Sequence, residues 1–213
     1  MNPHVILAFI AVACVAIVSP GPATILAIRN GTKFGMRAVV WSALGNVSGL
    51  FCLSAASMLG LGMLLESSTV LFGAVKVVGA VYLFYMGARQ LLGHSTAVPA
   101  ATYDASMSAL PRRRHLYREA LLTAATNPKP ILFFTAMFPQ FVNEHAPLLM
   151  QFFVLTGIFV SLSFASLLSY ALLASRATAL LSRPGFSKWL NRTFGSIFIA
   201  FGAALLTLRR QGT

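Results

Sequence analysis

Charged side chains are rare in this sequence of 213 residues: Asp, Glu, Lys and Arg together make up 9% of it, whereas 57% of the residues are hydrophobic. Soluble globular domains typically contain about 25% charged residues. The mean hydropathy is +0.79, so too few polar side chains are present to cover a compact soluble particle. These values exclude a soluble globular protein and a disordered chain. A membrane protein remains.

Side chains that usually build catalytic and metal sites are also scarce, since the sequence has four acidic residues, two cysteines and four histidines. Cys14 and Cys52 lie inside apolar stretches, which argues against a disulfide framework on exposed loops. The histidines lie outside the apolar interiors and form no metal-ligand pair with a cysteine or an acid. The motifs of zinc proteases and serine hydrolases are absent as well. We therefore predict no metal, no cofactor and no enzymatic activity.

Six apolar runs are long enough, at about 20 residues, to cross the hydrocarbon core as helices. They are Val5–Ile28, Ala38–Leu65, Leu71–Leu92, Ala120–Val142, Ala146–Ser175 and Trp189–Leu208. The last run is interrupted by Arg192, and its uncharged part, Thr193–Leu208, has only 16 residues, so five spans remain the alternative. The expected fold is an all-α, multi-pass membrane protein with six transmembrane helices.

The net charge of +12 comes from 16 Lys and Arg against 4 Asp and Glu. Twelve of the cations fall in or beside the three odd-numbered loops, two follow the last span, and Lys76 and Lys129 lie within spans. Because cytoplasmic loops collect Lys and Arg, this distribution predicts that both termini lie outside the cytoplasm. The positive charge therefore reflects orientation and not nucleic-acid binding. The run Arg112–Arg114 is expected to anchor this topology, or alternatively to contact anionic membrane lipid.

A stretch rich in Ser, Thr, Ala and Pro, His94–Pro111, is typical of a flexible linker. It divides the predicted membrane domain into a first three-helix repeat, residues 1–93, a basic cytoplasmic linker, residues 94–118, and a second three-helix repeat, residues 119–213. Pro-x-Pro units at 20–22 and 128–130 occupy matching spans of the two repeats, 108 residues apart. Three spans is an odd number, so the second repeat crosses the membrane in the opposite sense. The pattern predicts a 3+3 inverted repeat, as in many secondary transporters.

The Pro-x-Pro units are the candidate site. Proline removes a backbone N–H and its ring collides with the preceding helical turn, so each unit breaks a span. Carbonyl groups freed in this way must be paired or must line a wet cavity, where they can bind the charged groups of a substrate; a plain proline kink is the alternative. The residues predicted to line the substrate or ion pathway are Ser19, Pro20, Gly21, Pro22, Asn127, Pro128, Lys129 and Pro130.

Lys129 lies nine residues into its span, where a charge costs at least about 2.5 kcal/mol. It is expected to face the protein interior and to hold a substrate carboxylate or carry a proton; the alternative is that it pairs with carbonyls freed by the break. Four glycines, Gly45 and Gly49 in the second span and Gly79 and Gly87 in the third, are expected at helix–helix contacts, because small residues let helices approach closely.

Several further marks occur in order along nearly the whole chain. They are Ser-Pro-Gly-Pro at 19–22, Gly31-x-x-x-Gly35, Gly45-x-x-x-Gly49, Lys76-x-x-Gly79-Ala80-x-Tyr82-Leu83-x-x-x-Gly87, Asn127-Pro128-Lys129 with Phe133–Phe134, Pro139-Gln140-Phe141 and Tyr170-Ala171. Together they resemble the LysE/RhtB family, the lysine exporter and homoserine/threonine resistance family. The chain departs from the family pattern at Ala23, where Asn or Asp is common, and at Ala120, where Gly is usual.

The resemblance implies a bacterial inner-membrane exporter of amino acids or close derivatives, driven by the proton or ion gradient without ATP, and it suggests a homodimer. The sequence itself adds one inference about the substrate. No acidic residue lies deep in a span, whereas a dibasic substrate would require a buried carboxylate, so we expect neutral amino acids such as threonine, homoserine or leucine. A divalent metal-ion exporter and a non-transporting membrane scaffold are the alternative functions.

Overall fold

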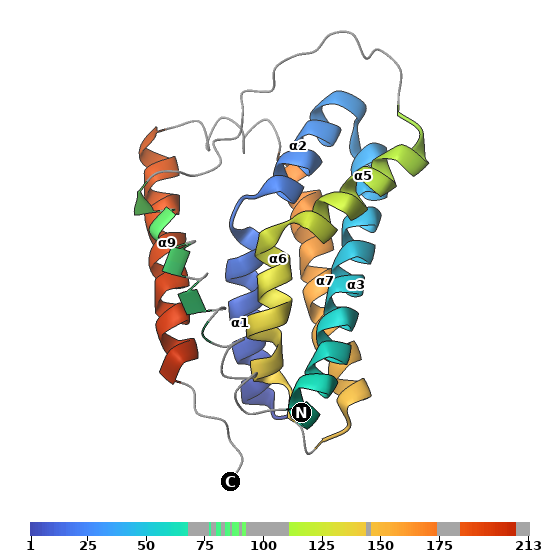
Figure 1. The fold of residues 1–213 in the computed structure, drawn as a ribbon. Coiled ribbons are helices and arrows are strands. Elements are labelled where there is room, and N and C mark those ends of the chain that lie inside the picture. Colours follow the sequence, from blue (N-terminus) through green and yellow to red (C-terminus); the bar gives the residue numbers. More distant parts are fainter. Residues whose placement is uncertain are drawn as a thin grey trace.

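The computed structural model describes residues 1–67, 111–143, 146–173 and 184–207, together with isolated positions between 77 and 92. All regular secondary structure within these residues is helical, which confirms the all-α prediction for this part of the chain (Figure 1). The helices are α1 (Pro3–Val18), α2 (Pro22–Phe34), α3 (Met36–Ser67), α5 (Arg113–Thr126), α6 (Pro128–Leu132), a π-helix η1 (Phe133–Met137), a 3-10 helix η2 (Phe138–Phe141), α7 (Leu148–Leu172) and α9 (Pro184–Thr207).

Within the described residues, two helices are long and apolar enough to cross a membrane, over Met36–Gly60 of α3 and Leu148–Leu172 of α7. Helices α1 and α2 together are also long and apolar enough, as one broken span or a re-entrant loop, and they are bent by 59° at the break. The predicted fourth span corresponds to the end of α5 followed by α6, η1 and η2, and the predicted sixth span falls on α9. Most of the predicted third span, residues 71–92, lies outside the described residues. The chain is a helical membrane protein.

The first break separates α1 from α2. Helix α1 ends at Val18, and the backbone of Gly21 is extended, with φ −155° and ψ −172°. Pro22 is the first residue of α2, a position where the missing N–H of proline disturbs no helical hydrogen bond. Helix α2 ends at Phe34, and the following Gly35, with a φ of +79°, turns the chain into α3; glycine adopts this conformation without strain.

The second break separates α5 from α6 at Asn127, which has an extended backbone with φ −74° and ψ 117°. A residue that precedes proline avoids the helical conformation, so Pro128 determines where α5 ends. The Asn127 side chain then caps the next helix, because its Oδ1 accepts a hydrogen bond from the Lys129 N–H at 3.1 Å. The two interrupted helices run in opposite directions through the molecule (Figure 1).

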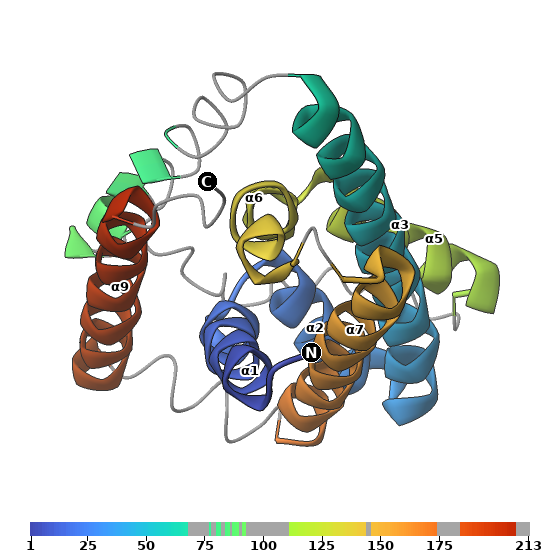
Figure 2. The same ribbon diagram turned by 90° about the horizontal axis from the view of Figure 1, so that it is seen from below.

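Aromatic side chains fill the half of the bundle that contains α1, η1, η2 and the first half of α7. The Phe133 ring lies 4.5 Å from Phe159 and 5.9 Å from Phe9, measured between ring centroids. Phe134 and Phe138 are fully buried in the same cluster. Seen from below, α6 lies between α1 and α3, and α7 lies across from it (Figure 2). The apolar core therefore closes one side of the two breaks.

Small residues bring α3 and α5 together. A Cβ atom added to Gly45 would lie 2.9 Å from the Tyr117 Cα atom, and one added to Gly49 would lie 2.8 Å from the Ala124 Cβ atom. Gly87 makes a similar close approach to Gly195 in α9, because an added Cβ atom would meet its carbonyl oxygen at 2.7 Å. All three glycines therefore lie at contacts between two helices. Gly79 lies outside the described residues.

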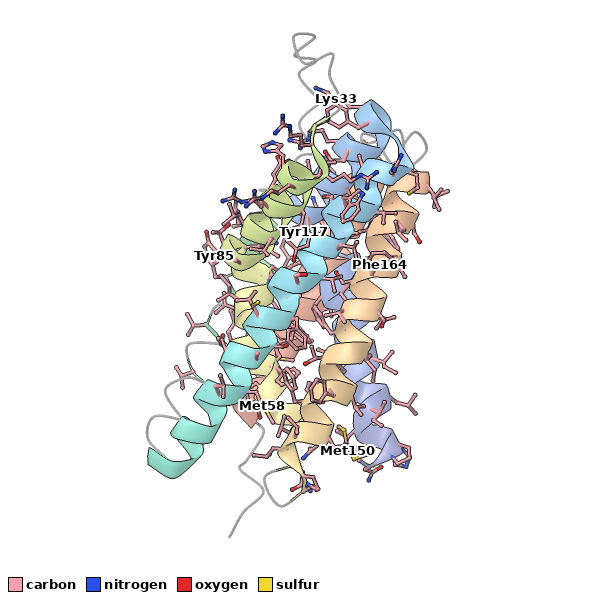
Figure 3. All side chains as sticks on the ribbon, turned by 90° about the vertical axis from the view of Figure 1, so that its right-hand side faces the viewer. Lys33, Met58, Tyr85, Tyr117, Met150 and Phe164 are labelled. Atoms are coloured by element: carbon pink, nitrogen blue, oxygen red, sulfur yellow. The ribbon has the colours of Figure 1, made fainter. Side chains whose placement is uncertain are left out.

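The predicted linker, residues 94–118, overlaps with α5, which begins at Arg113; residues 94–110 lie outside the described residues. The segments assigned to the two repeats do not form separate bodies here, since α3 packs along both α5 and α7 (Figure 2). The Lys33 end of the molecule is opposite the end that carries Met58 and Met150 (Figure 3). At the Lys33 end, Arg29 and Glu119 join α2 to α5 through an ion pair of 2.7 Å.

Candidate functional site

The two helix breaks meet in the middle of the bundle, and Lys129 connects them. Its Nζ atom donates a hydrogen bond of 2.5 Å to the Ser19 carbonyl oxygen, across 110 positions of sequence. The last carbonyl groups of a helix have no partner within the helix, so α1 requires donors from elsewhere at its end. Lys129 provides one of these donors. Such pairing with a carbonyl group freed by the break is the alternative to substrate binding that the sequence predicted for Lys129.

Tyr170 of α7 holds the same end of α1. Its hydroxyl group donates a hydrogen bond of 2.6 Å to the Val18 carbonyl oxygen. Two consecutive carbonyl groups of the first break are therefore bound by side chains that come from the second half of the chain. This arrangement fixes the position of the first break relative to α6 and α7.

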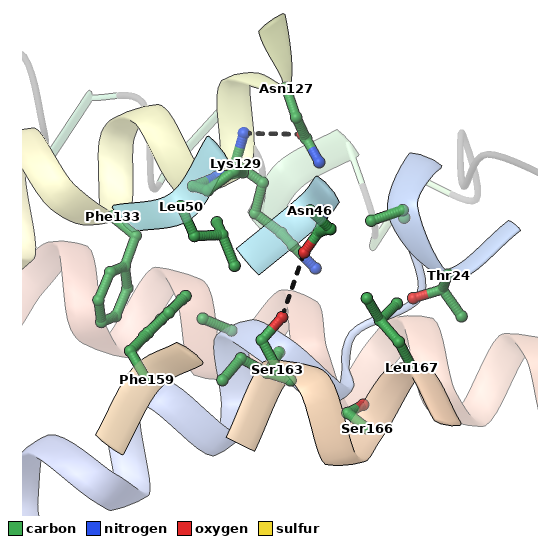
Figure 4. A pocket seen from close by; sticks show the side chains of 15 residues that line it. Thr24, Asn46, Leu50, Asn127, Lys129, Phe133, Phe159, Ser163, Ser166 and Leu167 are labelled. Carbon is green, nitrogen blue, oxygen red and sulfur yellow. Dashed lines mark hydrogen bonds between the residues drawn. The ribbon is translucent and has the colours of Figure 1, made fainter. Parts of the chain in front are cut away.

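A cavity lies directly beside these contacts and contains about 50 Å³ of free volume (Figure 4). This is room for a few water molecules and far less than the roughly 300 Å³ or more of a typical ligand pocket. The lining residues come from both breaks and from the middle of α3 and α7. They are Ala16, Ile17, Gly21, Ala23, Thr24, Asn46, Leu50, Asn127, Lys129, Pro130, Phe133, Phe159, Ser163, Ser166 and Leu167.

The cavity has a polar layer and an apolar layer. Asn46 of α3 and Ser163 of α7 face each other across it, and the Ser163 hydroxyl group donates to the Asn46 Oδ1 atom at 3.4 Å (Figure 4). Leu50 lies one helical turn from Asn46, and Phe159 lies one turn from Ser163 in the same direction. Of the described residues that line the cavity, only Lys129 is charged.

Ala23 and Thr24, in the first turn of α2, line this cavity. No side chain caps this helix, and the described residues provide no acceptor for the N–H groups of Ala23 and Thr24. The start of α6 differs, because Asn127 caps the Lys129 N–H, while Pro128 and Pro130 have no N–H. A helix N-terminus carries partial positive charge and binds anions. The α2 start and the Lys129 ammonium group together form a site suited to a carboxylate.

Four of the eight residues predicted for the pathway line this cavity: Gly21, Asn127, Lys129 and Pro130. Ser19 is 1% exposed and takes part through its carbonyl group. Pro20, Pro22 and Pro128 lie at the breaks without lining the cavity. The structure thus brings both predicted segments to one place. Whether these residues carry a substrate remains a prediction.

Sequence reasoning missed four polar residues that line the cavity, Thr24, Asn46, Ser163 and Ser166. Each is a small polar residue within an otherwise apolar run, which was the available signal. The described residues that line the cavity include no Asp, Glu, His or Cys. Within the described part of the chain, no three such residues are grouped so that they could hold a metal ion.

The contribution of the Tyr170 hydrogen bond to the stability of the protein can be tested by mutation. Tyr170→Phe removes one hydrogen bond, which contributes about 1 kcal/mol, so we expect the melting temperature in detergent to fall by about 2–4 °C. Ser169→Ala is the matched control, because the Ser169 hydroxyl group donates its hydrogen bond to the Ala165 carbonyl oxygen of its own helix. Equal melting temperatures for Tyr170→Phe and the wild type would show that the contact does not stabilise the break.

The chain is similar to a protein family and to several known proteins. Residues 14–209 match the LysE type translocator family. The chain is 32% identical over 213 residues to an uncharacterized membrane protein of Vibrio cholerae, covering 98% of this chain and 100% of the relative. It is 33% identical over 191 residues to the homoserine/homoserine lactone efflux protein of Salmonella typhimurium, covering 90% of each. It is 27% identical over 203 residues to an uncharacterized membrane protein of Bacillus subtilis, covering 93% and 97%. No solved structure matches the chain.

Proposed function

The chain belongs to the LysE type translocator family, and on this premise we propose that it is a secondary-active exporter of neutral amino acids or close derivatives. It moves them out of the cytoplasm and uses the proton or ion gradient without ATP. The observation that carries the proposal is the meeting of two opposed helix breaks, joined by Lys129, at a cavity with a polar layer. Broken helices that meet within the membrane are a common way to build a transport site.

The proposed topology is six transmembrane helices in a 3+3 inverted repeat, in the inner membrane of a bacterium, with both termini outside. Two features support it: the interrupted helices α1–α2 and α5–α6 run in opposite directions (Figure 1), and each breaks at its Pro-x-Pro unit. The end of α2 and the start of α5, both rich in cations, lie at the same end of the molecule, which we assign to the cytoplasm. A homodimer remains part of the proposal.

The chemistry of the cavity suits an amino acid with a neutral side chain. The substrate carboxylate would bind the Lys129 ammonium group and the N–H groups at the start of α2. The substrate ammonium group would face the C-terminal ends of α1 and α5, which carry partial negative charge. Because none of the described lining residues has a carboxylate, a second cation on the substrate side chain would find no acidic partner among them. Lysine and arginine are therefore disfavoured.

The size of the cavity indicates how transport would proceed. About 50 Å³ is too small for a whole amino acid with its side chain, so the helices around the breaks must separate to admit one. Lys129 would then exchange the Ser19 carbonyl oxygen for the substrate carboxylate. In this scheme the breaks open alternately to the two sides of the membrane, and the Lys129 contact closes the empty site.

Metal-ion export fits the cavity less well. Transition-metal paths are built from carboxylate, imidazole or thiolate ligands, and the described part of the cavity lining provides none of them. The ammonium group of Lys129 would also repel a cation. The described geometry thus favours an organic anion or zwitterion as the substrate.

The direct test is export from bacteria fed with dipeptides, with and without this protein, followed by mass spectrometry of every amino acid in the medium. We expect one or a few neutral amino acids to appear faster when the protein is present, and the difference to vanish when the proton gradient is collapsed. Faster export of lysine than of threonine, homoserine or leucine would contradict the assigned substrate class. No difference for any amino acid, with the protein present in the membrane, would contradict the proposed function.

A further inference from the structure

We propose that Asn46 and Ser163 form the subsite that binds the substrate side chain. This subsite favours a side chain with an oxygen atom over an aliphatic side chain of the same size. The inference rests on the proposed function, because it concerns the same cavity. It assigns the choice among neutral amino acids to two residues on α3 and α7, away from the helix breaks.

The first observation is an incomplete hydrogen-bond arrangement inside the bundle. Asn46 is 4% exposed and Ser163 is 7% exposed, and both line the cavity. Their mutual hydrogen bond is long, at 3.4 Å, and it uses the Oδ1 atom of Asn46. The Asn46 Nδ2 group makes no hydrogen bond to a described residue. It is not one of the fully buried unpaired atoms there, which are Asn30 Nδ2 and Thr156 Oγ1, so it keeps some accessible surface. An oxygen atom of a ligand in the cavity would accept from it.

The second observation is the position of this pair relative to the other groups. Figure 4 shows the Lys129 side chain extending toward Asn46 and Ser163. An amino acid whose carboxylate is bound by Lys129 would therefore have its side chain close to the pair. Leu50 and Phe159 close the cavity one helical turn further on, which limits the length of the side chain.

A purely structural role makes a different prediction. Polar side chains between transmembrane helices often hold the helices together. If Asn46 and Ser163 did only this, their replacement would lower stability and slow the transport of every substrate equally. A subsite, in contrast, changes the ratio between two substrates that differ by one oxygen atom. A site built to bind a hydroxyl group rejects an analogue that lacks it, because its polar groups are then left unpaired.

Threonine and valine are suitable probes, since they have nearly the same shape and differ by a hydroxyl group in place of a methyl group. We would measure the uptake of each labelled amino acid into proteoliposomes that contain the full chain and are preloaded with the same unlabelled amino acid. The expected result is that the wild type prefers threonine by about tenfold or more. In Asn46→Leu the ratio is expected to approach one, through slower threonine and unchanged or faster valine transport.

Ser163→Ala is the second variant and is expected to lower the ratio by a smaller factor, which keeps the test decisive if Asn46→Leu does not fold. Ser54→Ala is the control, because Ser54 is also a buried residue of α3, but its hydroxyl group bonds to the Phe51 carbonyl of its own helix. Ser54→Ala should keep the wild-type ratio. A wild-type ratio near one, or an unchanged ratio in a variant that still transports, would overturn the subsite. A wild type that transports no amino acid would overturn the proposed function as well.

Discussion

Lys129→Ala is expected to reduce export by about 10- to 100-fold, to the level of cells that lack the protein, while the variant still reaches the membrane. Hydrogen bonds to charged groups contribute about 1.5–3 kcal/mol, and each 1.4 kcal/mol corresponds to a factor of ten. Among the described residues that line the cavity, Lys129 is the only charged one, so no other side chain of this set can form an ion pair with the substrate carboxylate. The measurement is the initial rate of export per molecule of protein in the membrane fraction.

The control for this variant is Lys188→Ala, which removes a lysine from an exposed position on α9. Its export rate should equal that of the wild type. Together the two variants separate the loss of a particular ammonium group from a general loss of positive charge. Retained export in Lys129→Ala, at a comparable amount of protein, would remove Lys129 from the mechanism.

The second large effect is expected on stability, at the contact between α3 and α5. Gly45→Ala places a Cβ atom 2.8 Å from the Tyr117 carbonyl carbon and 2.9 Å from its Cα atom. The obstacle is backbone, so the helices must move apart, and we expect a cost at or above the upper end of the roughly 1–3 kcal/mol of ordinary overpacking. The melting temperature in detergent should fall by about 6 °C or more.

Gly60→Ala provides a matched control on the same helix, because a Cβ atom at Gly60 meets nothing within 4 Å. Alanine is a better helix former than glycine by about 1 kcal/mol, so this variant should be unchanged or slightly more stable. Replacing glycine by alanine in α3 is thus expected to lower stability at position 45 and to leave it unchanged or raise it at position 60. Equal melting temperatures for Gly45→Ala and Gly60→Ala would contradict the close packing of α3 on α5.

The helix breaks could be predicted from the sequence because proline acts locally. Pro22 and Pro128 each begin a new helix, and the loss of an N–H and the restriction on the preceding residue are properties of the residue itself. The interior position of Lys129 followed in the same way from the cost of a charge in the membrane. Its contact with Ser19, however, depends on how the two halves fold together.

The polar layer of the cavity could not be predicted in this way. Asn46 and Ser163 are 117 positions apart, and only the rotation of α3 and α7 about their axes brings them face to face. Both helices carry apolar side chains around most of their circumference, so periodicity gives only a weak signal of which face points inward. Tyr170 was noticed as part of a family pattern, but its hydrogen bond to Val18 is likewise a matter of tertiary packing.

Glycine spacing marked Gly45 and Gly49 as contact residues but did not identify their partner. The partner helix, α5, begins at Arg113, inside the segment predicted as linker. The start of α5 was not predicted as a helix because this segment is charged, and a search for transmembrane spans relies on uncharged runs. Amphipathic or charged helix starts at a membrane surface are therefore read as loops when hydropathy alone is used.

The account is tested most directly with purified protein in proteoliposomes. Labelled threonine or homoserine is provided on one side, a proton gradient is imposed, and transport is compared among wild-type vesicles, Lys129→Ala vesicles and vesicles without protein. The account predicts gradient-dependent transport by the wild type alone. Equal transport in all three, or wild-type transport that Lys129→Ala retains in full, would contradict a substrate site at the two helix breaks.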